Sequence, residues 1–250
     1  MDNPPPPPEA ALTVFEDRLD LAIRYVALLA DTGISHGLLG PRERPRLWDR
    51  HVFNCAVISP LFGPASEVAD VGSGAGLPGL PLAIARPDLD VTLIEPLLRR
   101  TRWLEEVVAQ LRLENVSVVR ARAEEMPNEH RFDFVTARAV APAAALARVA
   151  LPLVKGGGAL HALKGERANR ELTSDQTAIL RMGASRCEIS RHGAGLVELE
   201  TVVLSVFVEA PVDRRVDRRG AAADARRRPQ GAMGAKSSRR RARRRPSSGA

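Results

Sequence analysis

The order of apolar and polar positions predicts strands alternating with helices over most of the chain. A short apolar run ends at Asp70, and further strand patterns cover 90–95, 115–120, 132–137, 158–164, 184–191 and 197–209. Apolar residues recur at helical spacing from Leu80 onward and over 97–111, 142–154 and 166–182. Because parallel strands need crossover helices and consecutive strands can pair antiparallel, the pattern predicts an α/β fold with a parallel sheet and an antiparallel edge pair.

Composition divides the rest of the chain into three further parts. Residues 9–64 carry helical patterns over 9–30 and from Leu47, which predict a helical extension that docks on the main domain, 65–210. Residues 1–8 are mostly proline and predict a disordered or extended leader. Residues 211–250 contain almost no large apolar residue and predict a disordered tail.

Glycines follow the first strand in a pattern that is typical of a ligand-binding turn. Gly72, Gly74 and Gly76 alternate directly after Asp70, and ordering three glycines is costly for a plain turn. The run from Gly74 to Gly79 also matches the dinucleotide fingerprint G-x-G-x-x-G, a match that is weak when it stands alone.

Two residues of this turn favour S-adenosylmethionine over a dinucleotide. A pyrophosphate needs free N–H groups at the start of the next helix, and Pro78 has none. Asp70 adds a carboxylate, which suits a sulfonium and an ammonium group better than it suits a phosphate. The acid-x-Gly-x-Gly-x-Gly arrangement resembles motif I of the class I methyltransferases.

Length and composition fit one sizeable core with a small accessory lobe. The chain has 250 residues, of which 44% are apolar. Its two cysteines, Cys55 and Cys187, lie far apart, which argues against a disulfide framework or a zinc site. No apolar run reaches the roughly 18 residues that span a bilayer, and the N-terminus has no signal-peptide pattern. These features predict a cytoplasmic protein without a metal or a membrane partner.

Net charge is distributed unevenly. The last 40 residues hold thirteen Arg and one Lys against three Asp, a local charge of +11. Since the whole chain carries +7, residues 1–210 carry about −4. The basic tail is expected to bind RNA without sequence preference.

Polar residues at the ends of predicted strands are candidates for cofactor contacts. Glu95 ends the second strand, where a carboxylate can accept hydrogen bonds from ribose hydroxyls, although an exposed strand-end Glu without a role is the alternative. Glu124 follows the third strand, where the adenine would lie. The run 136–141 follows the fourth strand at the expected catalytic mouth and contains no Asn-Pro-Pro-aromatic motif and no cysteine. That absence argues against methylation of an exocyclic amine or a pyrimidine carbon.

The stretch 47–55 brings together Trp48, Arg50 and His51 in a chain with only two Trp and five His. Trp48 could pack between lobes, and His51 could be a core or capping residue with its hydrogen bonds satisfied. Aromatic rings beside cations also hold single-stranded bases, so a role in RNA binding is equally open.

Six segments together resemble the bacterial small-subunit (16S) ribosomal RNA guanine-N7 methyltransferase family, also called glucose-inhibited division protein B. They are 47–51, 70–79, 95–100, 122–124, 137–139 and 163–166, within a resemblance that covers roughly residues 12–208. Ala137 departs from the family pattern, in which many relatives have Ser before the Arg. The leader and the basic tail lie outside the resemblance.

The resemblance implies a seven-stranded class I Rossmann-like fold, S-adenosylmethionine as methyl donor and guanine N7 of 16S ribosomal RNA, free or in the small subunit, as acceptor. We expect the protein to act as a monomer. Guanine N7 has no proton to lose, so no residue is assigned a catalytic role, and Arg50, His51 and Lys164 are candidates for holding RNA. The candidate cofactor-binding residues, some from the strand pattern and some from the resemblance, are Gly72, Gly74, Leu77, Glu95, Ala123, Glu124 and Arg138.

Three other interpretations stay open on the residues. The chain could be a methyltransferase of small molecules with the same fold. Turnover of a metabolite, rather than binding of RNA, would identify this activity. The chain could be a non-enzymatic RNA-binding or ribosome-assembly factor, which would have no affinity for S-adenosylmethionine. A nicotinamide dehydrogenase is the third, and Pro78 and Asp70 argue against it.

Overall fold

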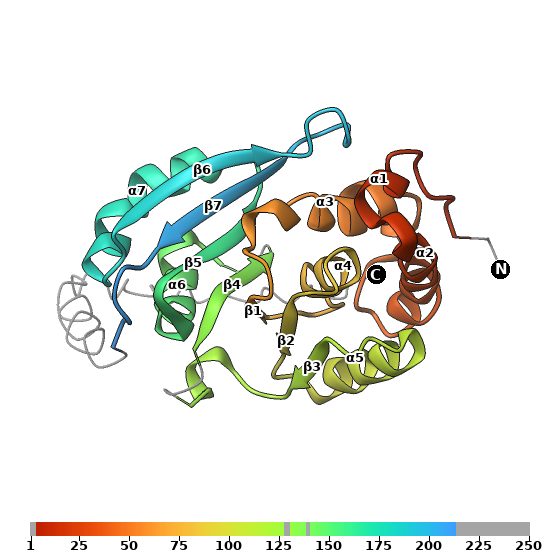
Figure 1. Ribbon diagram of the computed structural model, residues 1–250, viewed down its shortest axis with the longest axis horizontal. Helices are drawn as coiled ribbons and strands as arrows, with labels where there is room; N and C mark the ends of the chain where they lie inside the picture. The colour runs from red at the N-terminus through yellow and green to blue at the C-terminus, as the bar shows by residue number, and fades with distance from the viewer. Residues whose placement is uncertain (1–3, 128–130, 139–140, 214–250) are drawn as a thin grey trace, which may run out of the picture.

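A seven-stranded sheet forms the centre of the molecule (Figure 1). The computed structural model describes residues 4–127, 131–138 and 141–213. The strand order is β3-β2-β1-β4-β5-β7-β6, in which β7 runs antiparallel to both of its neighbours. The predicted parallel sheet with an antiparallel pair is thus confirmed. The strands are β1 (Glu67–Val71), β2 (Asp90–Ile94), β3 (Val116–Val119), β4 (Phe132–Arg138), β5 (Val154–Lys164), β6 (Arg186–His192) and β7 (Thr201–Phe207).

Helices cover both faces of the sheet and enclose two apolar cores (Figure 1). Side chains alternate along β1, so Val68 packs into the core beneath α4 (Gly79–Ala85) and α5 (Leu98–Leu111), while Ala69 packs into the other core. That second core lies beneath α6 (Ala143–Ala150) and α7 (Ala168–Arg181). Since helices cover both faces, the central strand β1 is buried from Val68 to Val71, whereas the edge strand β6 has only exposed and half-buried positions.

The first predicted helix, 9–30, is broken. It consists of α1 (Ala11–Phe15), a 3-10 turn (Glu16–Arg18), α2 (Leu19–Leu28) and a π turn (Leu29–Gly33). Glu16 has a φ of 48°, which changes the direction of the chain between the two helices. The break lets Phe15 pack against Trp48 and Phe53, with ring centroids 6.3 and 6.4 Å apart. Helical periodicity could not reveal it, because its cause is a contact with a segment more than 30 residues away.

Packed residues extend beyond the predicted extension and main domain, 9–210, at both ends. Residues 4–8 of the leader lie mostly half-buried, and Trp48 Nε1 donates to the Pro5 carbonyl at 2.9 Å. This part of the leader is therefore packed against the helical extension. At the other end, Arg131 donates to the Val212 carbonyl at 3.3 Å, and the Val212 side chain is buried. The rest of the predicted tail, 214–250, and residues 139–140 of the predicted mouth lie outside the described residues.

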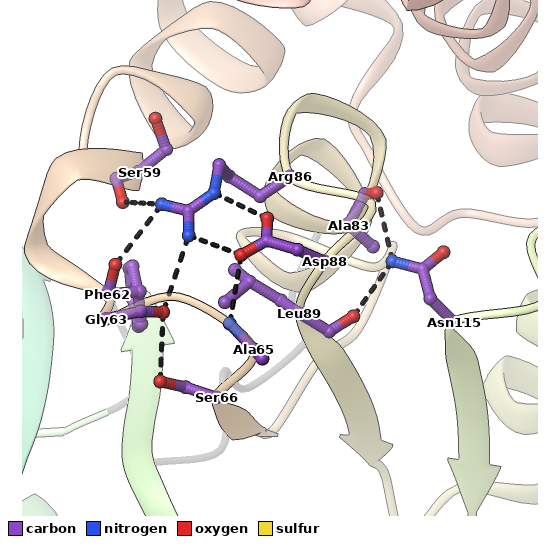
Figure 2. Close-up of polar contacts among 10 residues, drawn as sticks. All are labelled: Ser59, Phe62, Gly63, Ala65, Ser66, Ala83, Arg86, Asp88, Leu89 and Asn115. Carbon is purple, nitrogen blue, oxygen red and sulfur yellow. Dashed lines mark hydrogen bonds and ion pairs between the residues drawn. The ribbon is translucent and has the colours of Figure 1, made fainter.

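Arg86 ties the helical extension to the amino ends of the strands (Figure 2). Its guanidinium donates to the carbonyls of Ser59, Phe62 and Gly63 at 3.1–3.4 Å. It also makes two 2.7 Å hydrogen bonds to the carboxylate of Asp88. This bidentate pairing holds the Asp88 pKa well below its usual range.

Replacing Arg86 with methionine should lower the free energy of unfolding by about 2 kcal/mol, because three carbonyls lose a charged donor and Asp88 loses its partner. Urea denaturation at pH 7 measures this loss. Arg102→Met on the exposed side of α5 is the matched control and should change stability by less than about 0.5 kcal/mol. Equal stability of the two variants would contradict the role given to Arg86.

Candidate functional site

The predicted glycine turn lies between β1 and α4, at the carboxyl end of β1. Gly72, Gly74 and Gly76 have φ values of 73°, 57° and 85°, a region that favours glycine. The N–H groups of Gly72 and Ser73 donate to the Ile94 carbonyl at 2.9 and 3.3 Å, which ties the turn to the end of β2. A left-handed backbone is therefore what these three alternating glycines supply.

The start of α4 offers no free N–H group to an anion. Gly79 N–H donates to Asp70 Oδ2 at 3.0 Å, and Leu80 N–H donates to the Gly76 carbonyl at 2.7 Å. Pro78 and the next proline, Pro81, have no N–H to give. Because a dinucleotide site needs such donors for its pyrophosphate, the geometry disfavours a nicotinamide cofactor more strongly than the sequence did.

Asp70 has a different role from the one expected of it. Its side chain is completely buried and caps the first turn of α4 through Gly79, rather than facing the turn's open side. Burial raises its pKa to about 7, and its second oxygen, Oδ1, has no hydrogen-bond partner in the described residues. The carboxylate is thus a helix cap within the turn.

Glu95 follows β2 and joins it to the glycine turn. It is 1% exposed, and its two oxygens accept from Gly74 N–H and from Leu97 N–H, both at 3.0 Å. Arg100 Nη1 lies 3.5 Å away. A carboxylate has about four lone-pair sites, so these contacts leave room for a further donor. Contact with a ribose stays a prediction.

The topology brings all seven predicted cofactor residues to the carboxyl ends of four neighbouring strands. Leu77 is buried in the glycine turn. Ala123 is buried and Glu124 exposed in the 3-10 turn η6 (Ala123–Glu125), which follows β3. Arg138 is the last residue of β4. Their shared edge supports one site, and their contacts with a cofactor stay predictions.

Arg138 connects the sheet to η4 (Leu47–Val52), a π-helical turn of the extension. Its guanidinium donates to the Arg50 carbonyl at 3.2 Å and to His51 Nδ1 at 2.8 Å. Cys55 Sγ lies 3.8 Å from the same side chain, and burial raises the pKa of this thiol to about 11. Cys55 is therefore a protonated packing residue and not a nucleophile.

A cavity of about 830 Å³ opens beside Arg138 at the carboxyl ends of β4 and β5. The predicted RNA-holding residues Arg50, His51 and Lys164 all line it, whereas the six other cofactor candidates do not. Lys164 already pairs with Glu171 at 2.9 Å and donates to the Ala141 carbonyl at 2.7 Å. The structure thus separates a glycine turn on one side of Arg138 from a charged cavity on the other.

Trp48 does not serve as a stacking platform. It is 3% exposed and packs edge-on against Phe15, so no ring face is open to a base. The packing interpretation of Trp48 is confirmed, and the base-stacking one is wrong. His51 is also buried, but unlike Trp48 it lines the cavity.

Tyr25 is a residue of the site that sequence reasoning missed. It lies on α2, is fully buried, and its hydroxyl donates to the Ala75 carbonyl of the glycine turn at 2.6 Å. Burial raises the pKa of this phenol well above its usual value, so the hydroxyl keeps its proton. Tyr25 is the only tyrosine of the chain, which was the one available signal.

Two kinds of feature were not found in the residues that the structure describes. No three or more His, Cys, Asp or Glu side chains gather as a metal site would. Within the same ranges, no helix has both the length and the apolar character needed to cross a bilayer.

Comparison with known structures agrees with the topology. The crystal structure of P. horikoshii TYW2 in complex with MeSAdo superposes with a TM-score of 0.50 at 20% identity and covers 63% of this chain and 62% of its own. A likeness at this level of identity shows a shared fold alone.

Comparison of the sequence is more specific. The family model of GidB, described as rRNA small subunit methyltransferase G, matches residues 18–197. Ribosomal RNA small subunit methyltransferase G of Thermobifida fusca is 52% identical over 207 residues, which cover 83% of this chain and 87% of the relative. The protein of that name from Salinispora tropica is 52% identical over 217 residues, covering 83% and 90%. The chain belongs to the rRNA small subunit methyltransferase G family.

Proposed function

We propose that the protein transfers the methyl group of S-adenosylmethionine to N7 of one guanine in 16S ribosomal RNA. The observation that carries this proposal is the arrangement around Arg138, with a glycine turn followed by a helix whose first N–H groups, of Gly79 and Leu80, are already bonded on one side, and a charged cavity on the other. Membership of a ribosomal RNA methyltransferase family favours RNA over a small molecule as acceptor, and an enzyme over an assembly factor.

The hydrogen-bonding groups of the glycine turn suit S-adenosylmethionine better than a phosphate-bearing cofactor. The N–H groups of Gly72, Ser73 and Gly74 are all bonded within the protein. The acidic side chains of Glu95 and Glu124 lie at the same edge and suit a ligand with an ammonium group and a sulfonium. Gly72, Gly74, Leu77, Glu95, Ala123, Glu124 and Arg138 would hold it. When bound, it supplies an electrophilic methyl group.

The cavity suits a guanine nucleotide. Its volume of about 830 Å³ lies within the usual range of ligand pockets. Guanine offers acceptors at N7 and O6 and a donor at its amino group, and the cavity wall carries both cations and carboxylates. N7 has a lone pair in the ring plane, so the protein needs to orient the base and exclude water but not to remove a proton.

The proposal includes a cytoplasmic location, since small ribosomal subunits are found there, and action as a monomer. Gel filtration coupled to light scattering checks the second point. A mass near 27 kDa is expected, and a stable dimer would contradict it.

The position of methylation can be read chemically. N7-methylguanine carries a fixed positive charge, which makes the RNA strand prone to scission after borohydride and aniline treatment. Ribosomal RNA from cells that lack the protein should lose one scission site in the 16S molecule, and the wild-type gene should restore it.

A gene encoding Arg138→Ala should restore no more than about a tenth of the scission. Arg138 is the only predicted cofactor residue that also lines the cavity, so its loss affects both the cofactor and the acceptor. Arg181→Ala, an exposed change at the end of α7, is the control and should restore it fully. Persistence of the site in the deletion strain, or loss of a mark from an exocyclic amine or a ribose, would overturn the N7 assignment.

Tyr25→Phe should weaken binding of S-adenosylmethionine roughly tenfold, because it removes one buried hydrogen bond to the glycine turn and leaves the ring in place. Isothermal titration calorimetry measures the affinity, and thermal unfolding shows whether the fold is kept. Phe15→Leu, a conservative change in the same extension but away from the turn, should leave the affinity unchanged. Wild-type affinity in Tyr25→Phe would refute a role for this hydroxyl.

A further inference from the structure

His51 lies between two charged side chains and is hydrogen-bonded to both. Its Nε2 is 2.7 Å from Glu43 Oε2, and its Nδ1 is 2.8 Å from Arg138 Nη2. Glu43 belongs to the 3-10 helix η3 (Pro41–Arg46), His51 to η4, and Arg138 to β4. Three separate segments thus form one chain of hydrogen bonds in the wall of the cavity.

The neighbours of His51 determine the protonation of its ring. A guanidinium can only donate, so Nδ1 must present a lone pair to Arg138. An ionised carboxylate can only accept, so Nε2 must carry the proton toward Glu43. A neutral ring protonated at Nε2 satisfies both contacts. A doubly protonated ring would turn an N–H group against the Arg138 donor.

Burial and the neighbouring guanidinium of Arg138 keep the ring neutral near pH 7. Burial is the main cause of a lowered pKa for His51, and Arg138 lowers it further. Glu43 opposes this shift, while Arg50, from the same helical turn as His51, adds to it. The hydrogen bond from His51 lowers the pKa of Glu43, so this carboxylate stays ionised. The remaining charged groups of the cavity wall are Lys164, Glu166, Glu171, Arg191 and Glu200.

We propose that His51 is a positioning residue whose neutral ring, held by Glu43, accepts a hydrogen bond from Arg138 and fixes the guanidinium at the cavity wall. The inference rests on the proposed methyl transfer, in which Arg138 serves both cofactor and acceptor. Protonation of His51 in acid breaks the bond to Arg138 and therefore slows the reaction.

Two substitutions distinguish the effect of losing the acceptor atom from the effect of changing the size of the side chain. His51→Asn offers an oxygen acceptor close to the place of Nδ1 and does not titrate, whereas His51→Phe has no acceptor. At pH 8, kcat for methylation of small ribosomal subunits should fall at least tenfold in His51→Phe, equivalent to about 1.4 kcal/mol. The Asn variant should recover most of that loss. His36→Asn, at an exposed histidine, should match the wild type.

The pH profile tests the protonation step. The ratio of kcat in His51→Asn to kcat in the wild type should rise as the pH falls from 8 to 5.5, because only the wild type loses its acceptor. Taking the ratio removes effects common to both proteins, such as titration of Asp70, whose pKa is about 7. A ratio that stays constant over this range overturns the proposal, as does wild-type kcat in a folded His51→Phe.

Nitrogen NMR of the histidine rings gives a readout that does not depend on catalysis. At pH 7.5 the wild-type protein should show His51 as the neutral form protonated at Nε2, with the resonance assigned by its loss in His51→Asn. A ring protonated at Nδ1, or at both nitrogens, would contradict the hydrogen-bond chain. If the ring has the expected form but the wild type methylates no ribosomal RNA, the proposed function fails and the hydrogen-bond chain stands.

Discussion

Replacing Glu95 with alanine should weaken binding of S-adenosylmethionine about a hundredfold. The buried carboxylate accepts from Gly74 N–H and Leu97 N–H, so its removal leaves two backbone donors without an acceptor. Each hydrogen bond to a charged group contributes about 1.5–3 kcal/mol, and loss of about 3 kcal/mol of binding energy is a factor of roughly 100. The effect reaches the ligand because Gly74 loses its bond to the residue after β2, so this part of the glycine turn must be ordered on binding, while Gly72 and Ser73 stay bonded to Ile94.

Calorimetric titration with S-adenosylmethionine checks this result. Glu95→Gln keeps one side-chain oxygen as an acceptor and should give an intermediate loss. Glu106→Ala, at an exposed position of α5, is the matched control and should bind as the wild type does. An affinity of Glu95→Ala within about threefold of the wild type would falsify the assignment of this residue to the cofactor site.

Gly79→Ala should lower the free energy of unfolding by about 3 kcal/mol. A Cβ atom at this position would lie 2.4 Å from Leu93 Cδ2 and 2.9 Å from Asp70 Oδ2. Leu93 and Asp70 are both completely buried, so neither can move away without disturbing the core beneath α4. The substitution would also displace the helix cap that Asp70 provides.

Urea denaturation measures this loss. Gly40→Ala is the control, because its Cβ would meet no atom within 4 Å, and it should change stability by less than about 0.5 kcal/mol. Gly79, the fourth glycine of the turn, is therefore needed because a side chain would not fit there and not because of its backbone conformation. Equal denaturation midpoints for Gly79→Ala and the wild type would show that α4 can shift away from β2, against this interpretation.

The order of elements could be predicted from the sequence because it depends on local patterns. Apolar runs, helical spacing and the glycines after Asp70 predicted the seven strands and the turn, and the structure confirms them. Errors of a few residues occur at element ends. The predicted strand 197–209 is shorter in the structure, β7 (Thr201–Phe207), because its first four residues belong to the loop before it.

Roles that depend on a distant partner could not be predicted in the same way. Trp48 and His51 are three residues apart in one motif, yet one is a packing residue and the other lines the cavity. The difference comes from Phe15 and Pro5 on one side and from Arg138, 87 residues away, on the other. No spacing rule within the motif encodes which of its side chains faces which neighbour.

The sequence by itself determined the fold class, the position of the glycine turn and the family to which the chain is similar. Only the tertiary structure decided that Asp70 caps a helix, that Tyr25 of the extension holds the turn, and that Glu43, His51 and Arg138 form one hydrogen-bond chain. Strand periodicity and glycine conformation are properties of neighbouring residues. Hydrogen-bond partners and burial are set only when the sheet brings separate segments to the same edge, because water satisfies those polar groups until then.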